Sequence, residues 1–109
     1  MKLTTIKQSR GAAIRFRGEC IASTSFDSRG GPMMLEIWET ERGALIPVTR
    51  GETPDGRPDV RAAIVRLVDG ADAPTLEMRL AVMDFFKWAD RAHSMVRDQL
   101  KWSLLIEVP

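Results

Sequence analysis

The sequence has few of the residues on which catalytic, metal and disulfide chemistry depends. Its 109 residues include one cysteine, one histidine and no tyrosine. A lone cysteine cannot form an intramolecular disulfide, which excludes a secreted, disulfide-stabilised scaffold and favours a reducing compartment. No apolar run approaches the roughly 18 residues that span a bilayer, and the N-terminal residues lack the apolar core of a signal peptide. We therefore expect a cytoplasmic protein.

An excess of one charge is also missing from the chain as a whole. Sixteen basic and 15 acidic residues give a formal net charge of +1, which excludes a strong global attraction to nucleic acid or to an anionic membrane. The distribution is uneven, because residues 1–18 contain basic side chains and no acid. These basic residues are Lys2, Lys7, Arg10, Arg15 and Arg17. Such a basic end either pairs with acids within the fold or binds an anionic partner.

The residues capable of chemistry form no catalytic or metal-binding pattern. His93 falls in a predicted helix, where a surface position explains it better than a role as general base. Cys20 lies in an alternating strand without basic neighbours, which favours a small buried side chain over a reactive thiolate. One Cys and one His cannot build a zinc site, and Arg29–Pro32 lacks the residues of a phosphate loop. We expect no enzyme activity, no metal and no cofactor.

Alternation of apolar and polar residues dominates the first 68 positions and predicts a sheet. In the clearest run, Leu35 and Ile37 point to one face while Trp38 points to the other. The predicted strands cover residues 3–7, 12–26, 33–40, 44–49 and 60–68. Gly18 allows a bend or bulge inside the second strand. Short turns between the strands favour an antiparallel meander, with residues 51–59 as a loop or hairpin tip.

Residues 73–102 carry the longest helical pattern in the chain. Apolar side chains recur there at steps of three and four residues, opposite a charged face, and the expected N-cap is Asp72. Apolar residues 104–108 then predict a possible final strand. The sequence thus predicts a single α+β domain over residues 1–109, in which an antiparallel sheet of about five strands packs against one long C-terminal helix.

The sheet face opposite the helix is the predicted binding surface. If Leu35 and Ile37 face the helix, the indole of Trp38 lies on the outer face as an apolar anchor with a hydrogen-bond donor at its edge. The reversed register would instead place Trp38 in the core. The candidate partner-binding residues are Met34, Trp38, Arg15, Arg17 and Glu36.

Three carboxylates, Glu36, Glu39 and Glu41, lie on or just after the central strand. Paired acids can serve as general acid and base. However, Arg15 and Arg17 on a neighbouring strand would form ordinary cross-strand ion pairs with them, and we favour this structural interpretation.

The N-terminal half of the predicted helix is apolar on nearly all sides, which is more than one sheet face can cover. Either strands or loops wrap the second side, or it faces another chain. A homodimer face is therefore predicted from Leu76, Leu80, Met83 and Phe86.

By exclusion, the predicted function is a small non-enzymatic protein-protein interaction module. Such a module would act by steric occlusion of a partner protein, as a stoichiometric inhibitor or antagonist of the phage, plasmid or immunity type. The alternative is nucleic-acid binding through the basic N-terminal strands, with Phe16 pointing away from Arg15 and Arg17. A third hypothesis is a small-molecule pocket between sheet and helix.

Overall fold

Five antiparallel strands follow one another in chain order to form a single sheet. The computed structural model describes all 109 residues. The strands are β1 (Lys2–Ile6), β2 (Ile14–Ser28), β3 (Gly31–Thr40), β4 (Leu45–Glu52) and β5 (Pro58–Ala62). The predicted α+β class and the five-stranded meander are confirmed. The fifth strand is shorter than predicted. Beyond Ala62 the chain bonds to β4 only through the Ala63 N–H, which donates to the Pro47 carbonyl at 3.2 Å, and through an isolated bridge between Val65 and Leu45.

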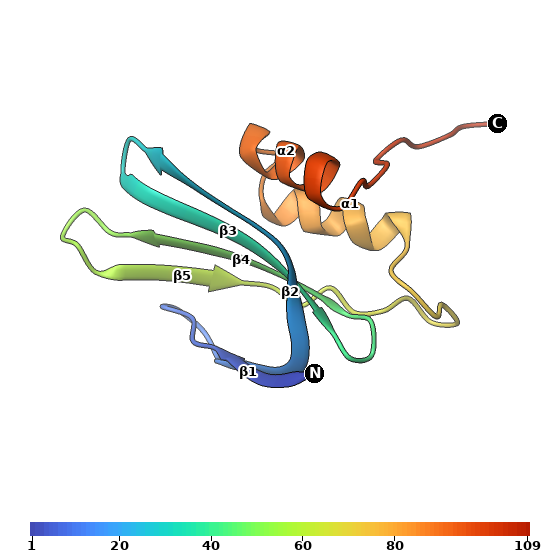
Figure 1. The fold of residues 1–109 in the computed structure, drawn as a ribbon, viewed down its shortest axis with the longest axis horizontal. Coiled ribbons are helices and arrows are strands. Elements are labelled where there is room, and N and C mark those ends of the chain that lie inside the picture. The colour runs from blue at the N-terminus through green and yellow to red at the C-terminus, as the bar shows by residue number, and fades with distance from the viewer.

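Two short helices, rather than the one long helix that we predicted over residues 73–102, cover one face of the sheet (Figure 1). They are α1 (Leu76–Phe85) and α2 (Asp90–Gln99). The chain turns between them because Lys87 and Trp88 adopt left-handed φ angles of 55° and 53°. Folding back allows both helices to bury apolar side chains against the same face. Neither helix is long and apolar enough to cross a membrane.

Two further predictions for the helical region are wrong. The N-cap of α1 is Thr75, whose hydroxyl oxygen accepts from the backbone N–H of Met78 at 3.4 Å, and not Asp72. Residues 104–108 form no strand, and the segment after α2 leads away from the sheet (Figure 1). Trp102 and Leu104 pack against the core that the sheet and the helices share, and residues 105–109 are exposed.

A long, bent β2 takes part in two separate cores. Its first half pairs with β1, and its second half pairs with β3 after a register shift between Cys20 and Ala22. The shift leaves Ile21 as an extra residue, which changes the face to which alternate side chains point. As a result, Phe16 packs on one side of the sheet and Ala22 on the other.

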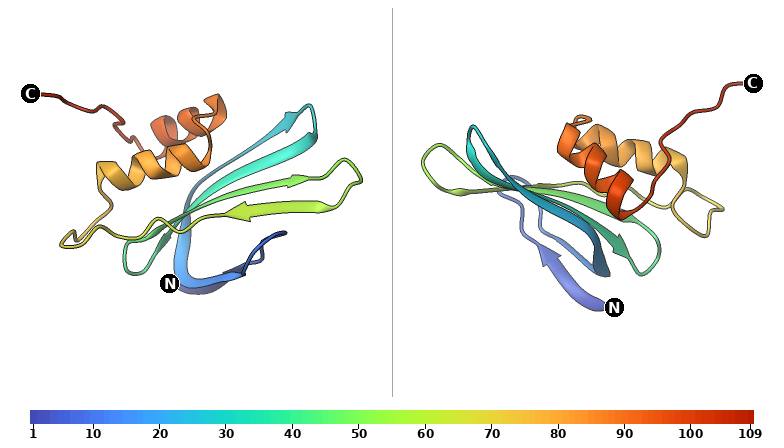
Figure 2. Two further views of the ribbon diagram at one scale, coloured as in Figure 1. Left: turned by 180° about the vertical axis from the view of Figure 1, so that it is seen from behind. Right: turned by 45° about the horizontal axis from the view of Figure 1, so that its top comes forward.

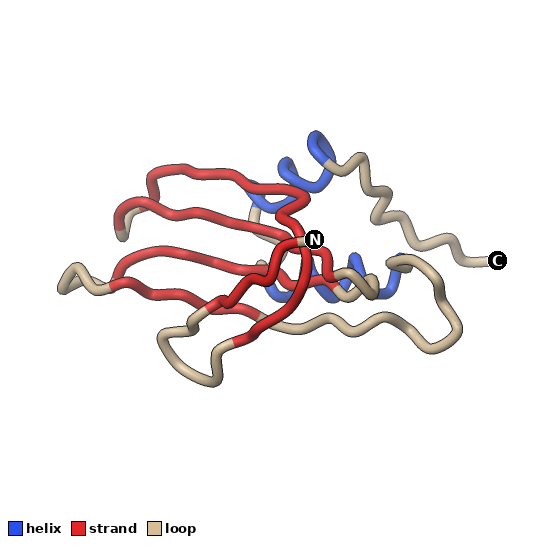
Figure 3. Tube along the Cα trace, turned by 60° about the horizontal axis from the view of Figure 1, so that its bottom comes forward, coloured by secondary structure: helices blue, strands red, loops and turns tan.

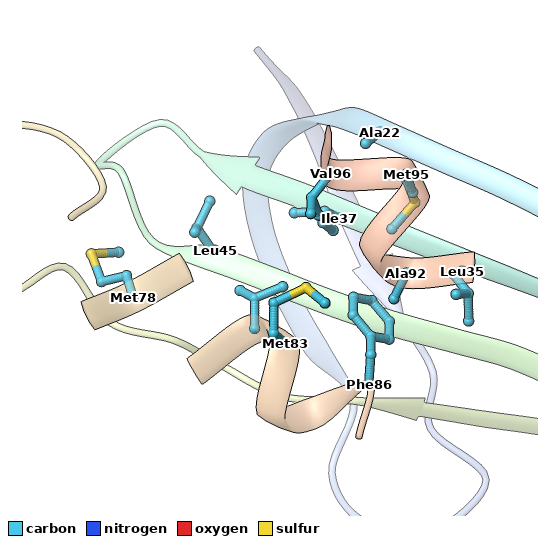
Figure 4. Close-up of a cluster of buried hydrophobic side chains, with 11 residues drawn as sticks. Ala22, Leu35, Ile37, Leu45, Met78, Met83, Phe86, Ala92, Met95 and Val96 are labelled. Carbon is cyan, nitrogen blue, oxygen red and sulfur yellow. The ribbon is translucent and has the colours of Figure 1, made fainter. Parts of the chain in front are cut away.

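The first core lies between the sheet and the helices (Figure 4). Leu35, Ile37 and Leu45 from the sheet are at most 4% exposed there, and Val82 and Val96 from the helices are fully buried. The side-chain alternation therefore correctly predicts that Leu35 and Ile37 face the helical layer. With 11 buried residues against three in the second core, this first core is the larger of the two.

The second core lies on the opposite face, where β1 and the first half of β2 curl beneath the sheet (Figures 2 and 3). Ile6, Ile46 and Val48 are its buried residues. A side chain and a backbone group of the β1–β2 loop join this curl to β5: the Gln8 Oε1 accepts from the N–H of Ala62 at 3.0 Å, and the backbone N–H of Ser9 donates to the Val60 carbonyl at 2.9 Å. The sheet is thus rolled into a nearly closed barrel.

Candidate functional site

A groove of about 510 Å³ opens at one end of the second core. Its apolar lining comes mainly from Ile14, Phe16, Ile46 and Ile64, residues that belong to or border the barrel interior. Four guanidinium-bearing side chains also line it. They are Arg15, Arg17, Arg42 and Arg66, which we call the arginine mouth.

Three separate segments bring these arginines together. Arg15 and Arg17 are exposed on β2, where the period of two places Phe16 on the inner side between them. Arg42 lies in the β3–β4 turn, which closes through a hydrogen bond from the Gly43 N–H to the Thr40 carbonyl at 2.9 Å. Arg66 follows β5, beyond the last pair with β4. The mouth therefore depends on the curl of the sheet and not on any local sequence motif.

No arginine of the mouth forms an ion pair. The ion pairs of the structure are Arg50–Glu36, Arg57–Asp55, Arg61–Asp59 and Arg97–Asp98. Our prediction that Glu36, Glu39 and Glu41 pair with Arg15 and Arg17 is thus wrong. Glu41 lines the groove without approaching an arginine to within 4 Å, and the Arg15 Nε donates instead to the Thr5 hydroxyl at 3.2 Å. The groove is left with an excess of positive charge.

The sheet face predicted to bind a partner is largely occupied by the protein itself. Trp38 lies opposite Leu35 and Ile37, as expected for an outer position, but it is half-buried against the second core. Its ring meets that of Phe16 edge to face, with 5.8 Å between the centroids. The Trp38 indole N–H donates to Glu36 Oε1 at 3.0 Å, so its polar edge is already satisfied. A partner-binding role for Met34, Glu36 and Trp38 stays a prediction.

Cys20 and His93 are both exposed and lie on different elements, β2 and α2. Partial burial and then the nearby charge of Glu36 raise the pKa of the Cys20 thiol, which keeps it protonated and poorly nucleophilic at neutral pH. Its Sγ donates weakly to the Ala22 carbonyl at 3.3 Å. The His93 ring contacts Trp88 edge to face, at 6.3 Å between centroids.

The predicted dimer face is not a continuous exposed surface. Met83 and Phe86 are 0% and 5% exposed, because the α1–α2 hairpin brings both into the first core. Leu76 and Leu80 remain half-buried. Only these last two residues of the predicted set are left for contact with another chain through α1.

The cleft between sheet and helices that we considered for a small molecule is present, with a volume of about 480 Å³. Phe26 and Met33 from the sheet face Phe85 and Phe86 from the helical side across it. Charged residues of both signs also line the cleft. They are Glu52, Asp59, Arg61 and Lys87. Since these charges cancel, the cleft lacks the polarity that would indicate one class of ligand.

Arg42 and Arg66 are the residues of the mouth that we did not predict. Each is a single arginine in a turn or at the end of a strand, and nothing in the local pattern distinguishes it from other surface arginines. No protein-family model matches the chain, and comparisons with curated proteins and with solved structures give no significant match. The function must therefore be argued from the geometry of the chain itself.

Proposed function

We propose that the chain is a non-enzymatic binding module of the cytoplasm, which docks onto an acidic surface of a partner protein and occludes it sterically. The observation that carries this proposal is the arginine mouth, in which four guanidinium groups without a carboxylate partner surround an apolar groove. An inhibitor or antagonist that acts stoichiometrically needs such a complementary surface and no catalytic residue.

Arginine suits this task better than lysine does. Its planar guanidinium can bind a carboxylate through two parallel hydrogen bonds, and its weaker hydration lowers the cost of removing it from water at an interface. The apolar groove between the arginines adds burial of apolar surface to the charge attraction. Binding hot spots of protein interfaces are enriched in arginine and lie in well-packed pockets.

The test is affinity capture from the native host with three forms of the protein. The wild type is compared with the double variant Arg42→Ala/Arg66→Ala and with the control Arg57→Ala/Arg97→Ala, which removes the same charge from exposed, already paired arginines. We expect the wild type and the control to retain the same acidic protein, and the mouth variant to lose it. Capture should weaken as salt is raised, because accessible charges are screened. Equal capture by the mouth variant would contradict the proposal.

Nucleic-acid binding is the second candidate function, and a specific observation favours it. Besides Arg15 and Arg17, the N-terminal basic residues Lys2, Lys7 and Arg10 are exposed and form no ion pair. Against it, the nearest aromatic side chain, Phe16, packs into the second core and is not presented for base stacking.

Titration with labelled single- and double-stranded oligonucleotides separates the two functions. Phosphate binding should weaken linearly on a log–log scale as salt rises, with a slope that the mouth variant makes shallower. Absence of binding to any oligonucleotide at low salt would exclude this second candidate.

A further inference from the structure

The segment after α2 exposes apolar side chains that belong to neither core of the fold. Leu105, Ile106 and Val108 are 67%, 61% and 83% exposed. No backbone N–H or carbonyl of residues 103–109 takes part in a backbone–backbone hydrogen bond outside the helices and strands, and the segment belongs to neither. In the sequence Leu105-Ile106-Glu107-Val108, two apolar residues alternate with Glu107, which is the pattern of a half-buried strand.

Beside the arginine mouth, the segment 64–66 has backbone N–H and carbonyl groups without hydrogen-bond partners, and another extended segment could pair with them. Val65 exchanges backbone hydrogen bonds with Leu45 at 2.8 and 2.9 Å, so its polar groups face β4. Because polar groups alternate along an extended segment, those of Ile64 and Arg66 face the other way, and neither residue makes a backbone hydrogen bond. An unpaired edge of this kind is a template for strand addition.

Across the gap between residues 64–66 and β2, the start of β2 has a second free edge. The backbone carbonyl of Arg17 points away from β1 and accepts from the Glu41 N–H. Arg15, two residues earlier, therefore has its backbone groups on that same edge, beyond the end of β3. A second groove of about 450 Å³ shares Ile14, Arg15 and Ile64 with the mouth, so the gap continues along both edges.

We infer that residues 105–108 of a second copy of this chain add as a strand beside Ile64–Arg66, and that two copies exchange these segments reciprocally. In this arrangement Ile106 and Val108 enter the barrel interior, where apolar side chains line the gap. Leu105 and Glu107 then point outward, which places the carboxylate of Glu107 among the unpaired arginines of β2. The alternation of apolar residues and the position of the charge therefore favour the same orientation of the added strand, with Ile106 and Val108 facing inward and Glu107 facing outward.

This dimer differs from the one predicted on the helix, and it goes beyond the proposed function. The exchanged segment occupies the arginine mouth, so self-association and capture of an acidic partner compete for one surface. Self-association itself needs no partner protein. The two proposals consequently fail separately, since one is measured on purified protein and the other in the presence of the host partner.

Sedimentation equilibrium over a range of protein concentrations tests the inference. We expect a concentration-dependent dimer for the wild type. Ile106→Lys places a charge where an apolar side chain enters the barrel, and Ile64→Pro removes the free edge donor without removing any hydrogen bond of the monomer. Each should raise the dimer dissociation constant at least about tenfold. The control Leu3→Lys changes a comparably exposed side chain on β1 and should leave the constant unchanged.

A mixture of the two variants distinguishes strand exchange from any other dimer. In the mixed dimer, the intact segment 105–108 of the Ile64→Pro chain meets the intact edge of the Ile106→Lys chain, and both changes fall in the other exchange site. A second change in a site that is already blocked costs little more, so an equimolar mixture, with one intact site per dimer, should associate more tightly than either variant alone. Circular dichroism checks that Ile64→Pro remains folded, and Ile106→Lys changes only an exposed position. A wild type that stays monomeric, a dimer that neither variant weakens, or a mixture no tighter than its components would each overturn the inference.

Discussion

The Arg50 Nε donates to Glu36 Oε2 at 3.2 Å, and Glu36 is the only charged side chain that the fold buries. The second carboxylate oxygen accepts from Trp38. A buried carboxylate that loses its cation keeps its desolvation penalty without the compensating attraction. This pair therefore supplies the counter-charge of Glu36 across the β3–β4 ladder, on the face away from the helices.

Arg50→Ala should lower the free energy of unfolding by about 1 to 3 kcal/mol, because Glu36 then stays buried with one hydrogen bond and no counter-charge. Urea denaturation measures the difference. The matched change Arg57→Ala breaks an exposed pair and should alter the free energy by less than about 0.5 kcal/mol. Equal effects of the two substitutions would show that the buried position of Glu36 is unimportant.

Gly18→Ala should destabilise the fold by about 1 to 3 kcal/mol, because overpacking at this site has no room to relax. A Cβ atom there would press against the backbone carbonyl of Glu39 and lie 2.9 Å from the ring of Phe16. Gly30 provides the control, since its added Cβ would meet only the Ser28 hydroxyl at 4.0 Å. Thermal denaturation of both variants should show a lower midpoint for Gly18→Ala alone.

Thr75→Ala should cost about 1 kcal/mol of stability, the usual effect of removing an N-cap side chain. The physical reason is that the first-turn N–H of Met78 loses its acceptor. Asp72→Ala is the comparison, because Asp72 is exposed and lies outside the helix. Guanidinium denaturation that gave the larger loss for Asp72→Ala would place the cap at the residue favoured by the sequence pattern.

Alkylation of Cys20 by iodoacetamide should reach its half-maximal rate at a higher pH than alkylation of the unfolded chain. Burial and the charge of Glu36 both disfavour the thiolate. Glu36→Gln removes only the second cause, so it should move the pH profile part of the way back. An alkylation profile that coincides with that of the unfolded chain would contradict the raised pKa.

The same shift has a consequence for stability. A thiol whose pKa is raised by folding stabilises the protein below the unfolded pKa, and this contribution is lost as the pH rises through the folded pKa. In alkaline solution the wild type should therefore lose stability relative to Cys20→Ser, whereas near neutral pH the difference between them should not change with pH. Denaturant midpoints at several pH values give this comparison.

Local alternation was sufficient to predict the first four strands, because each strand of a meander pairs with its neighbour in sequence. Leu35 and Ile37 could be assigned to the helical face for the same reason. However, alternation overextended the fifth strand and predicted a strand over residues 104–108 that the structure lacks. The turn between the helices could not be predicted in this way. Residues 86–89 contain neither Gly nor Pro, and the chain turns there because α2 gains burial by folding back onto the sheet.

The arginine mouth illustrates a second limit of sequence patterns. Arg15 and Arg17 were evident as an alternating basic pair, but Arg42 and Arg66 join them only through the curl of the sheet. The expected ion pairs with Glu36 failed for a related reason, since Glu36 is turned toward Arg50. The curvature of the sheet depends on many residues together, so no single spacing between residues in the sequence predicts which arginines it brings together.

The bent strand β2 ties the mouth to the helices, because one continuous backbone forms a wall of both cores. Neither core can open while β2 keeps its pairs with β1 and β3, so both should melt in one cooperative transition. Amide hydrogens in the middle of β2 should then exchange only when the whole molecule unfolds. A ligand held at the mouth would slow their exchange and raise the melting temperature of helices that it never touches.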